Sequence, residues 1–164
     1  MKTITRTKIY LPMAAMILSA ALGLPAAAQT QIPFNGTFQG NDTDTCFSFP
    51  TVCVTTTGTG IGTLVGQFSF TLENTVNLSN GTEAGSATLI AANGDSITTT
   101  VVGSGERTAI HGVISITEIY TITGGTGRFA GAQGSFTVNR LASGITFLTS
   151  GSFHGTITSP GAAH

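Results

Sequence analysis

Alternation of apolar and polar residues at every second position restricts the fold of this chain more than any other feature. In residues 64–72, Phe68 and Phe70 fall on one face, while Gln67 and Ser69 fall on the other. A period of two is typical of a half-buried β-strand, whereas an amphipathic helix repeats every 3.6 residues. No helical period is found after the first 28 residues. The chain is therefore predicted to be all-β.

Short turn signals divide this pattern into about eight strands. Asn93-Gly94-Asp95 lies between two alternating segments and predicts a hairpin. A second turn is expected at residues 104–106. The predicted strands are residues 34–40, 52–57, 64–72, 85–92, 96–103, 108–123, 131–141 and 145–157.

Eight antiparallel strands in a chain of this length favour a closed β-barrel, because closure removes the unpaired strand edges. Glycines inside the predicted strands, such as Gly66, Gly134 and Gly155, fit the coiling and bulges of a barrel. A two-sheet β-sandwich is the alternative. Residues 29–164 have the length of a single domain.

The first 28 residues have the composition of a secretory signal peptide. Three basic residues precede an apolar run over residues 9–24, and Ala26-Ala27-Ala28 stands directly before Gln29. The run is shorter than the ~20 apolar residues that a membrane-spanning helix needs. The protein is therefore expected to be secreted or periplasmic, with no membrane attachment after cleavage.

The charge of residues 29–164 disfavours two classes of partner. They contain no lysine, and three arginines stand against seven acidic residues, a net charge of −4. Nucleic acid and anionic lipid surfaces are poor partners for such a chain. An outer-membrane barrel is also disfavoured, because the chain has no Trp and Tyr120 is the only tyrosine after residue 28.

Cys46 and Cys53 are the only cysteines. In an oxidising compartment they are expected to form a disulfide that closes a small loop. Two free thiols, or half of a metal site, are the alternatives. No metal site is predicted, because His111 and His154 fall on the polar faces of their strands without a third ligand.

The sequence Gly-Gly-Thr-Gly-Arg-Phe at residues 124–129 cannot continue an ordinary strand, because glycines cluster where the backbone needs positive φ or a close approach. It lacks the helix start and the Lys-Ser/Thr pair of a phosphate-binding loop. Gly124, Gly125, Gly127 and Arg128 are therefore predicted to form a tight structural turn.

Together with Ala132 and Gly134, this stretch resembles a turn shared by the allene oxide cyclase and dirigent barrels and their bacterial secreted relatives. The resemblance implies an eight-stranded antiparallel barrel, often a homotrimer, with an apolar lumen. In that family the plant cyclases close a fatty-acid epoxide, and the dirigent proteins orient phenoxy radicals. Both act without cofactors, so no cofactor is expected here.

Glu118 is the candidate catalytic group. It shares the apolar face of its predicted strand with Tyr120. Burial there would raise the pKa of Glu118 and suit it to act as a general acid or base, with Tyr120 as a hydrogen-bond donor. The structural alternative is an ion pair between Glu118 and Arg128 or Arg140.

The function predicted from these features is a secreted barrel of unassigned activity that binds a small apolar molecule in its lumen. A cofactor-free cyclase or coupling-guide enzyme is one alternative, and a structural or interaction protein of the cell envelope is another. The residues expected to line the binding site are Phe68, Phe70, Ile116 and Phe147.

Overall fold

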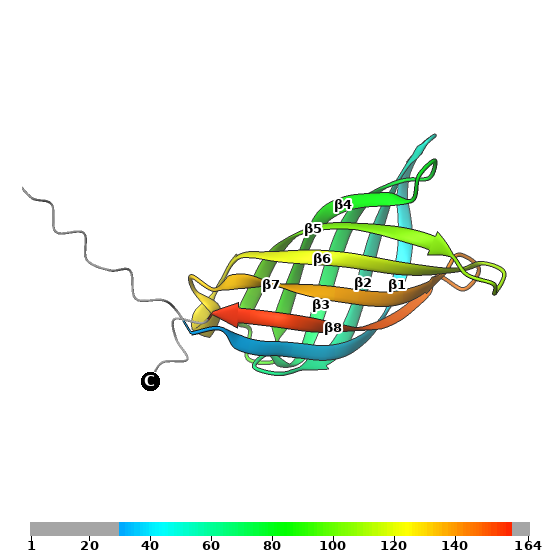
Figure 1. Cartoon of the computed structure of the whole chain (residues 1–164). Coiled ribbons are helices and arrows are strands. Elements are labelled where there is room, and N and C mark those ends of the chain that lie inside the picture. Colours follow the sequence, from blue (N-terminus) through cyan, green and yellow to red (C-terminus); the bar gives the residue numbers. More distant parts are fainter. Residues whose placement is uncertain (1–29, 159–164) are drawn as a thin grey trace, which may run out of the picture.

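The computed structural model describes residues 30–158, which form a closed barrel of eight antiparallel strands (Figure 1). Consecutive strands are neighbours, and β8 pairs with β1 to close the sheet. The predicted barrel is confirmed, and the sandwich alternative is wrong. The elements are β1 (Ile32–Ser48), β2 (Thr51–Gly62), β3 (Gly66–Asn77), β4 (Thr82–Ala91), β5 (Ser96–Arg107), β6 (Val113–Gly125), the 3₁₀ turn η1 (Gly127–Phe129), β7 (Gln133–Ser143) and β8 (Leu148–Thr158).

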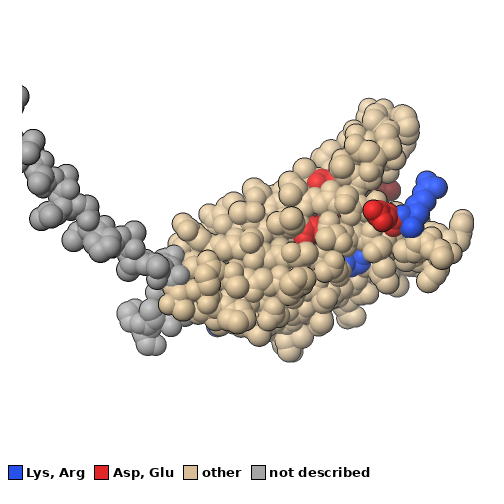
Figure 2. Space-filling view, in the orientation of Figure 1, with Lys and Arg blue, Asp and Glu red and all other residues tan. Residues whose placement is uncertain are grey.

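The predicted signal peptide, residues 1–28, lies outside the described residues. Within residues 30–158, no helix is long and apolar enough to cross a membrane. The outer surface of the barrel is rich in exposed threonines, such as Thr71, Thr75 and Thr100. Few charged side chains are visible on the face shown in Figure 2, and they lie toward the end from which the β1–β2 hairpin projects.

Most strand boundaries differ from the sequence prediction, and two of the differences have a clear physical reason. The hairpin at Asn93–Asp95 is confirmed between β4 and β5, but the turn expected at residues 104–106 is wrong. That segment belongs to β5, where Gly105 pairs with Ile116 of β6. The glycine faces inward and leaves room for the side chains of Ile114 and Ile116, so it reflects barrel packing and not a turn.

The second difference concerns the start of β8. Ile145 and Phe147 were expected in this strand, but they lie in the β7–β8 turn, and Phe147 has a φ of 59°. The Ser143 hydroxyl accepts hydrogen bonds from the backbone N–H groups of Ile145 and Thr146 and holds the turn. A serine hydroxyl that bonds to nearby backbone in this way offers the chain an alternative to the strand.

Aromatic side chains fill the middle of the barrel. The ring of Phe34 lies 5.2 Å from that of Phe136 and 4.9 Å from that of Phe153, measured between centroids. Phe38 and Phe70 form an edge-to-face pair at 5.3 Å. Such pairs stabilise the core beyond the area that they bury.

Inward-facing glycines on neighbouring strands make room for these rings. Gly58 of β2 pairs with Phe70 of β3, and Gly60 pairs with Phe68. A Cβ atom on Gly60 would overlap the Phe68 ring. The aromatic core therefore depends on glycine at these positions of the sheet.

Gly124 and Gly125 were predicted in a tight turn but belong to β6, where they pair with Thr98 and Ile97 of β5. The turn that follows, at residues 126–129, closes one end of the barrel. Gly127 has a φ of +57°, and a Cβ atom there would collide with the carboxylate of Asp95. Phe129 is almost fully buried at this end. Arg128 lies over the Phe129 ring, donates a hydrogen bond to the Val65 carbonyl and forms an ion pair with Asp95 at 3.6 Å. We refer to this end as the plugged end.

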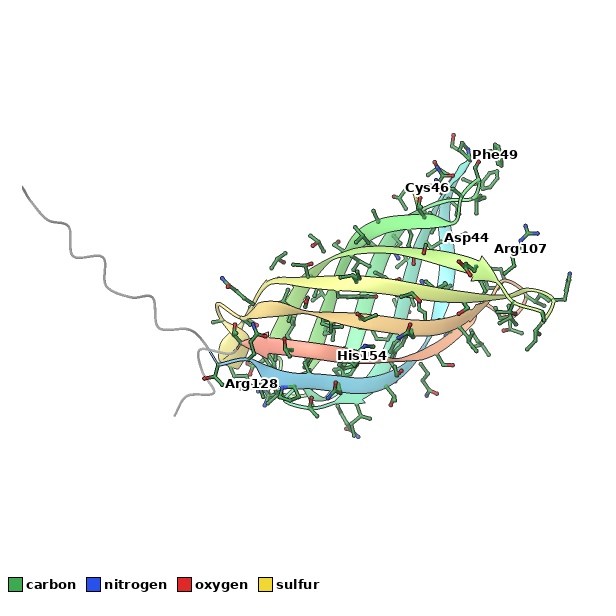
Figure 3. The ribbon with its side chains drawn as sticks, viewed as in Figure 1. Asp44, Cys46, Phe49, Arg107, Arg128 and His154 are labelled. Atoms are coloured by element: carbon green, nitrogen blue, oxygen red, sulfur yellow. A yellow bond between two sulfur atoms is a disulfide. The ribbon has the colours of Figure 1, made fainter. Side chains whose placement is uncertain are left out.

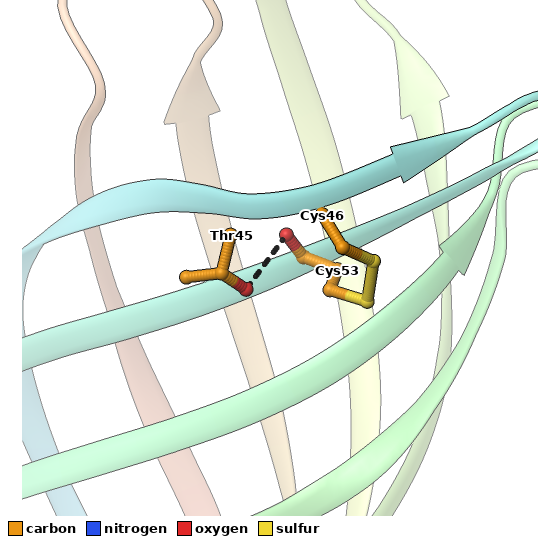
Figure 4. Close-up of a disulfide and its surroundings, with 3 residues drawn as sticks. All are labelled: Thr45, Cys46 and Cys53. Carbon is orange, nitrogen blue, oxygen red and sulfur yellow. Dashed lines mark hydrogen bonds between the residues drawn. A yellow bond between two sulfur atoms is a disulfide. The ribbon is translucent and has the colours of Figure 1, made fainter.

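The β1–β2 hairpin projects beyond the opposite end, as Figure 3 shows with the labels of Cys46 and Phe49. The predicted disulfide between Cys46 and Cys53 is confirmed and links the two strands of the hairpin (Figure 4). Beside it, the Thr45 hydroxyl donates a hydrogen bond of 3.4 Å to the Cys53 carbonyl. We call this end of the barrel the mouth.

Candidate functional site

A cavity of about 500 Å³ opens at the mouth. This volume lies within the range of roughly 300–1,000 Å³ that is typical of small-molecule sites. Asp42, Glu83 and Arg140 form its polar floor. Its walls are largely apolar, and their apolar side chains come from four strands: Val52, Val54, Val76, Ile114, Ile116 and Ala142.

Arg140 of β7 organises the floor through an ion pair with Glu118 of β6. Nε donates to Glu118 Oε2 at 3.1 Å, and one terminal nitrogen donates to Oε1 at 3.2 Å. This bidentate geometry is the strongest that an arginine makes with a carboxylate. Of the two arginine partners considered for Glu118 from the sequence, Arg140 is the one present.

The two terminal nitrogen atoms of Arg140 also face oxygen atoms of other residues. Nη1 donates to the Thr149 hydroxyl at 3.3 Å and lies 3.6 Å from an Asp42 carboxylate oxygen, while Nη2 lies 3.6 Å from Glu83. The Arg140 side chain is only 4% exposed. All three guanidinium nitrogens are therefore engaged by the protein itself.

Glu83 of β4 is the floor residue with the most altered acidity. Burial, followed by repulsion from Glu118, raises its pKa to about 8, against the opposing attraction of Arg140. A carboxyl group with this pKa is mostly protonated at neutral pH. A side-chain hydrogen bond joins Glu83 to Glu118. This hydrogen bond also favours the protonated form of Glu83, which raises its pKa further.

Two further side chains lie below the floor. Asn74 of β3 donates from Nδ2 to Glu83 at 3.1 Å and to Glu118 at 3.2 Å. The Tyr120 hydroxyl donates to Glu118 at 3.4 Å, and burial, reinforced by the charge of Glu118, raises the pKa of Tyr120. Two buried acceptors, Asn74 Oδ1 and Glu83 Oε1, accept no hydrogen bond from the residues that the structure describes.

Cross-strand glycines also accommodate this polar cluster. Gly103 pairs with Glu118, and Gly151 pairs with Arg140. A Cβ atom on Gly103 would lie 2.8 Å from Cγ of Glu118. The carboxylate and the guanidinium thus fit inside the barrel only because the facing strand positions lack side chains.

The residues predicted to form the binding site are divided between two places. Ile116 and Phe147 line the mouth cavity. Phe68 and Phe70 lie in the aromatic core, where the remaining space is about 30 Å³. The candidate catalytic pair, Glu118 and Tyr120, is buried and does not line the mouth cavity.

Sequence reasoning missed Asp42, Asn74 and Glu83. The signal for Glu83 was present, because it shares the inward face of β4 with Ala87 and Leu89. A charged residue on the apolar face of a strand indicates a buried polar site in the same way that Glu118 does.

Exposed apolar side chains surround the mouth. Phe47 and Phe49 at the hairpin tip are 70% and 74% exposed. The other turns at this end contribute Leu78, Ile110, Ile145 and Phe147. An apolar molecule approaching the cavity therefore meets an apolar rim.

No family model, no curated protein and no solved structure matches the chain. Among residues 30–158, no group of three or more His, Cys, Asp or Glu side chains is arranged to hold a metal ion. The geometry of the mouth is therefore the basis on which a function is proposed.

Proposed function

We propose that this protein is a secreted β-barrel that binds a small apolar molecule in the mouth cavity. One observation carries the proposal: about 500 Å³ of space lies between apolar walls at the mouth, whereas about 30 Å³ remains in the aromatic middle of the barrel. The site thus lies nearer the open end than the lumen position expected from Phe68 and Phe70.

Both parts of the cavity support binding. Each CH₂ group that a ligand buries against the apolar walls contributes roughly 0.8 kcal/mol. The buried polar floor orients a ligand, because a few placed polar groups in an apolar pocket fix the direction in which it binds.

Binding is favoured over catalysis by the position of Glu118. Its side chain is fully buried and held by Arg140, and it does not line the cavity. The enzyme alternative would need this carboxyl group to reach a bound molecule. Trimerisation, which the family resemblance implies, stays a prediction.

The proposal also includes secretion of the protein and its resemblance to a known barrel family. The Cys46–Cys53 disulfide supports an oxidising compartment, where such bonds persist. The eight-stranded barrel is the fold that the resemblance to allene oxide cyclase and dirigent barrels implies. Neither observation identifies the ligand.

Filling the cavity tests the proposal. Ile116→Trp places a large ring inside the mouth, and we expect it to weaken the binding of a neutral fluorescent naphthalene dye at least about tenfold, equivalent to about 1.4 kcal/mol. Ile119→Trp is the matched control, because Ile119 lies on the same strand with its side chain exposed. The measurement is a fluorescence titration of both variants and the wild type, with circular dichroism to confirm folding.

The two variants separate the alternatives. Equal dye affinity for folded Ile116→Trp and for the wild type would place the dye elsewhere and contradict a mouth site. A wild-type protein that binds no apolar dye or alkyl ligand would contradict the binding function itself.

A further inference from the structure

We infer that the molecule bound at the mouth carries an amine, or another cationic hydrogen-bond donor, as its head group, and that this group docks on Glu83. The inference rests on the proposed function, because it names the chemical class of the ligand for the same cavity. It is based on which hydrogen-bond donors and acceptors of the cavity floor already have partners in the protein.

The floor has more carboxyl groups than guanidinium groups. Asp42, Glu83 and Glu118 surround the single Arg140. Asp44 also lines the cavity. The other arginine of the lining, Arg107, is exposed at the rim and projects away from the barrel in Figure 3. An acidic cavity favours a cationic ligand over an anionic one.

Hydrogen-bonding capacity points in the same direction. Every nitrogen of Arg140 already faces Glu118, Thr149, Asp42 or Glu83. A carboxylate or phosphate head group would therefore need to displace one of these partners.

A donor head group meets an available acceptor instead. Glu83 lines the cavity, its side chain is 3% exposed, and its Oε1 accepts no hydrogen bond from the described residues. Once Glu83 has lost its proton, this oxygen is a buried acceptor without a partner, which is unfavourable, and a ligand that donates to it offsets that cost. An ammonium group has three N–H donors and no acceptor, which matches a carboxylate.

The charged and polar groups around Glu83 predict a proton linkage. Asp42 of β1, Asn74 of β3, Glu118 and Tyr120 of β6 and Arg140 of β7 form its surroundings. Without ligand, burial and Glu118 raise the pKa of Glu83 to about 8. A bound cation lowers this pKa. Binding of the cation at neutral pH therefore releases a proton.

Three ligands that share one alkyl chain test the inference. Decylammonium, decanol and decanoate differ only in the head group, so their affinities at pH 7.5 compare head groups at constant apolar area. We expect decylammonium to bind at least about tenfold tighter than decanoate, with decanol between them. Calorimetry in two buffers of different ionisation enthalpy should detect proton release with decylammonium and none with decanol.

Glu83→Gln locates the effect. This variant should lose the preference for decylammonium over decanol and the proton release. Glu73→Gln is the matched control, because Glu73 is exposed on the outer face of the neighbouring strand β3. It should retain the wild-type preference.

The outcomes distinguish the two proposals. If decanol and decylammonium bind equally, if decanoate binds tightest, or if Glu83→Gln keeps the wild-type preference, the head-group inference is overturned and the binding function stands. If none of the three ligands binds the wild type, the binding function fails as well.

Discussion

A few buried charged side chains determine the electrostatics of the mouth cavity. Glu118 is fully buried, and Arg140 is almost as deeply buried. Buried ions are stable only when they are paired and hydrogen-bonded, and removing one partner costs about 3–5 kcal/mol. Both carboxylate oxygens of Glu118 accept hydrogen bonds from Arg140. Glu83 places a second carboxyl group beside the same Arg140 guanidinium. This surplus carboxyl group makes the floor sensitive to pH.

The first residue-scale prediction is that Glu83→Gln changes how stability depends on pH. The folded pKa of Glu83, about 8, lies above the ordinary value of 4.5. Between these values the folded protein holds a proton that the unfolded chain releases, so the wild type loses stability as pH rises, by at most about 1.4 kcal/mol per pH unit. The variant lacks this loss. Urea unfolding at pH 5, 7 and 9 measures the free energy of unfolding of both proteins.

The expected sign is specific. Glu83→Gln should gain stability relative to the wild type between pH 5 and pH 9, whereas Glu73→Gln, at an exposed position of β3, should follow the wild type throughout. Parallel pH profiles for Glu83→Gln and the wild type would show that Glu83 holds no extra proton in the folded state.

Period-two alternation identified Glu118 as inward-facing, and it also offered Arg140 as a partner. It could not show that Asp42 and Glu83 join the same guanidinium, because their strands, β1 and β4, meet β7 only across the closed lumen. Contacts across a barrel depend on its curvature, which a single strand pattern does not contain.

At the scale of elements, glycine on one strand and a large side chain on the next form the repeated unit of packing. Gly60 and Phe68 show it in the aromatic core, and Gly103 and Glu118 show it in the polar cluster. Cross-strand pairs of this kind fix register, because a shift by one residue would turn every inward side chain outward.

We therefore predict that Gly60→Ala destabilises the barrel by about 1–3 kcal/mol, the usual cost of overpacking a core. The new Cβ atom would overlap the Phe68 ring, and the Thr37 carbonyl lies close on the other side. Gly105→Ala is the control, because its Cβ atom would lie 3.0 Å from Ile114 and 3.3 Å from Ile116, at side-chain ends near the mouth. Thermal unfolding of the two variants should differ clearly, and equal losses would contradict packing by glycine and aromatic pairs.

The strands themselves could be predicted in number and order, but not at every boundary. The turn residues Asn93–Asp95, which lie between two alternating segments, located the β4–β5 hairpin correctly. The prediction failed at Gly105, which was expected in a turn but belongs to strand β5. It also failed at Phe147, which fits the apolar positions of the alternating pattern but lies in a turn with a positive φ. In both places tertiary packing or a local hydroxyl hydrogen bond outweighs the residue pattern.

For the whole molecule, closure creates two unlike ends. Phe129 and the turn around Gly127 block the plugged end, while the mouth stays open beneath the β1–β2 hairpin. Closure could be inferred from eight antiparallel strands in a chain of this length, because closure removes the unpaired strand edges. The division of the lumen into a filled middle and an open mouth could not, because it depends on which glycine faces which aromatic ring.

The most direct test is to locate a bound alkyl ligand by nuclear Overhauser effects from decanol to methyl groups of the full-length protein. We expect contacts to Val76, Ile114 and Ile116, which line the mouth cavity. Contacts confined to Leu89 and Val138 in the middle of the barrel, or to the exposed Ile119 on its outer face, would contradict this expectation.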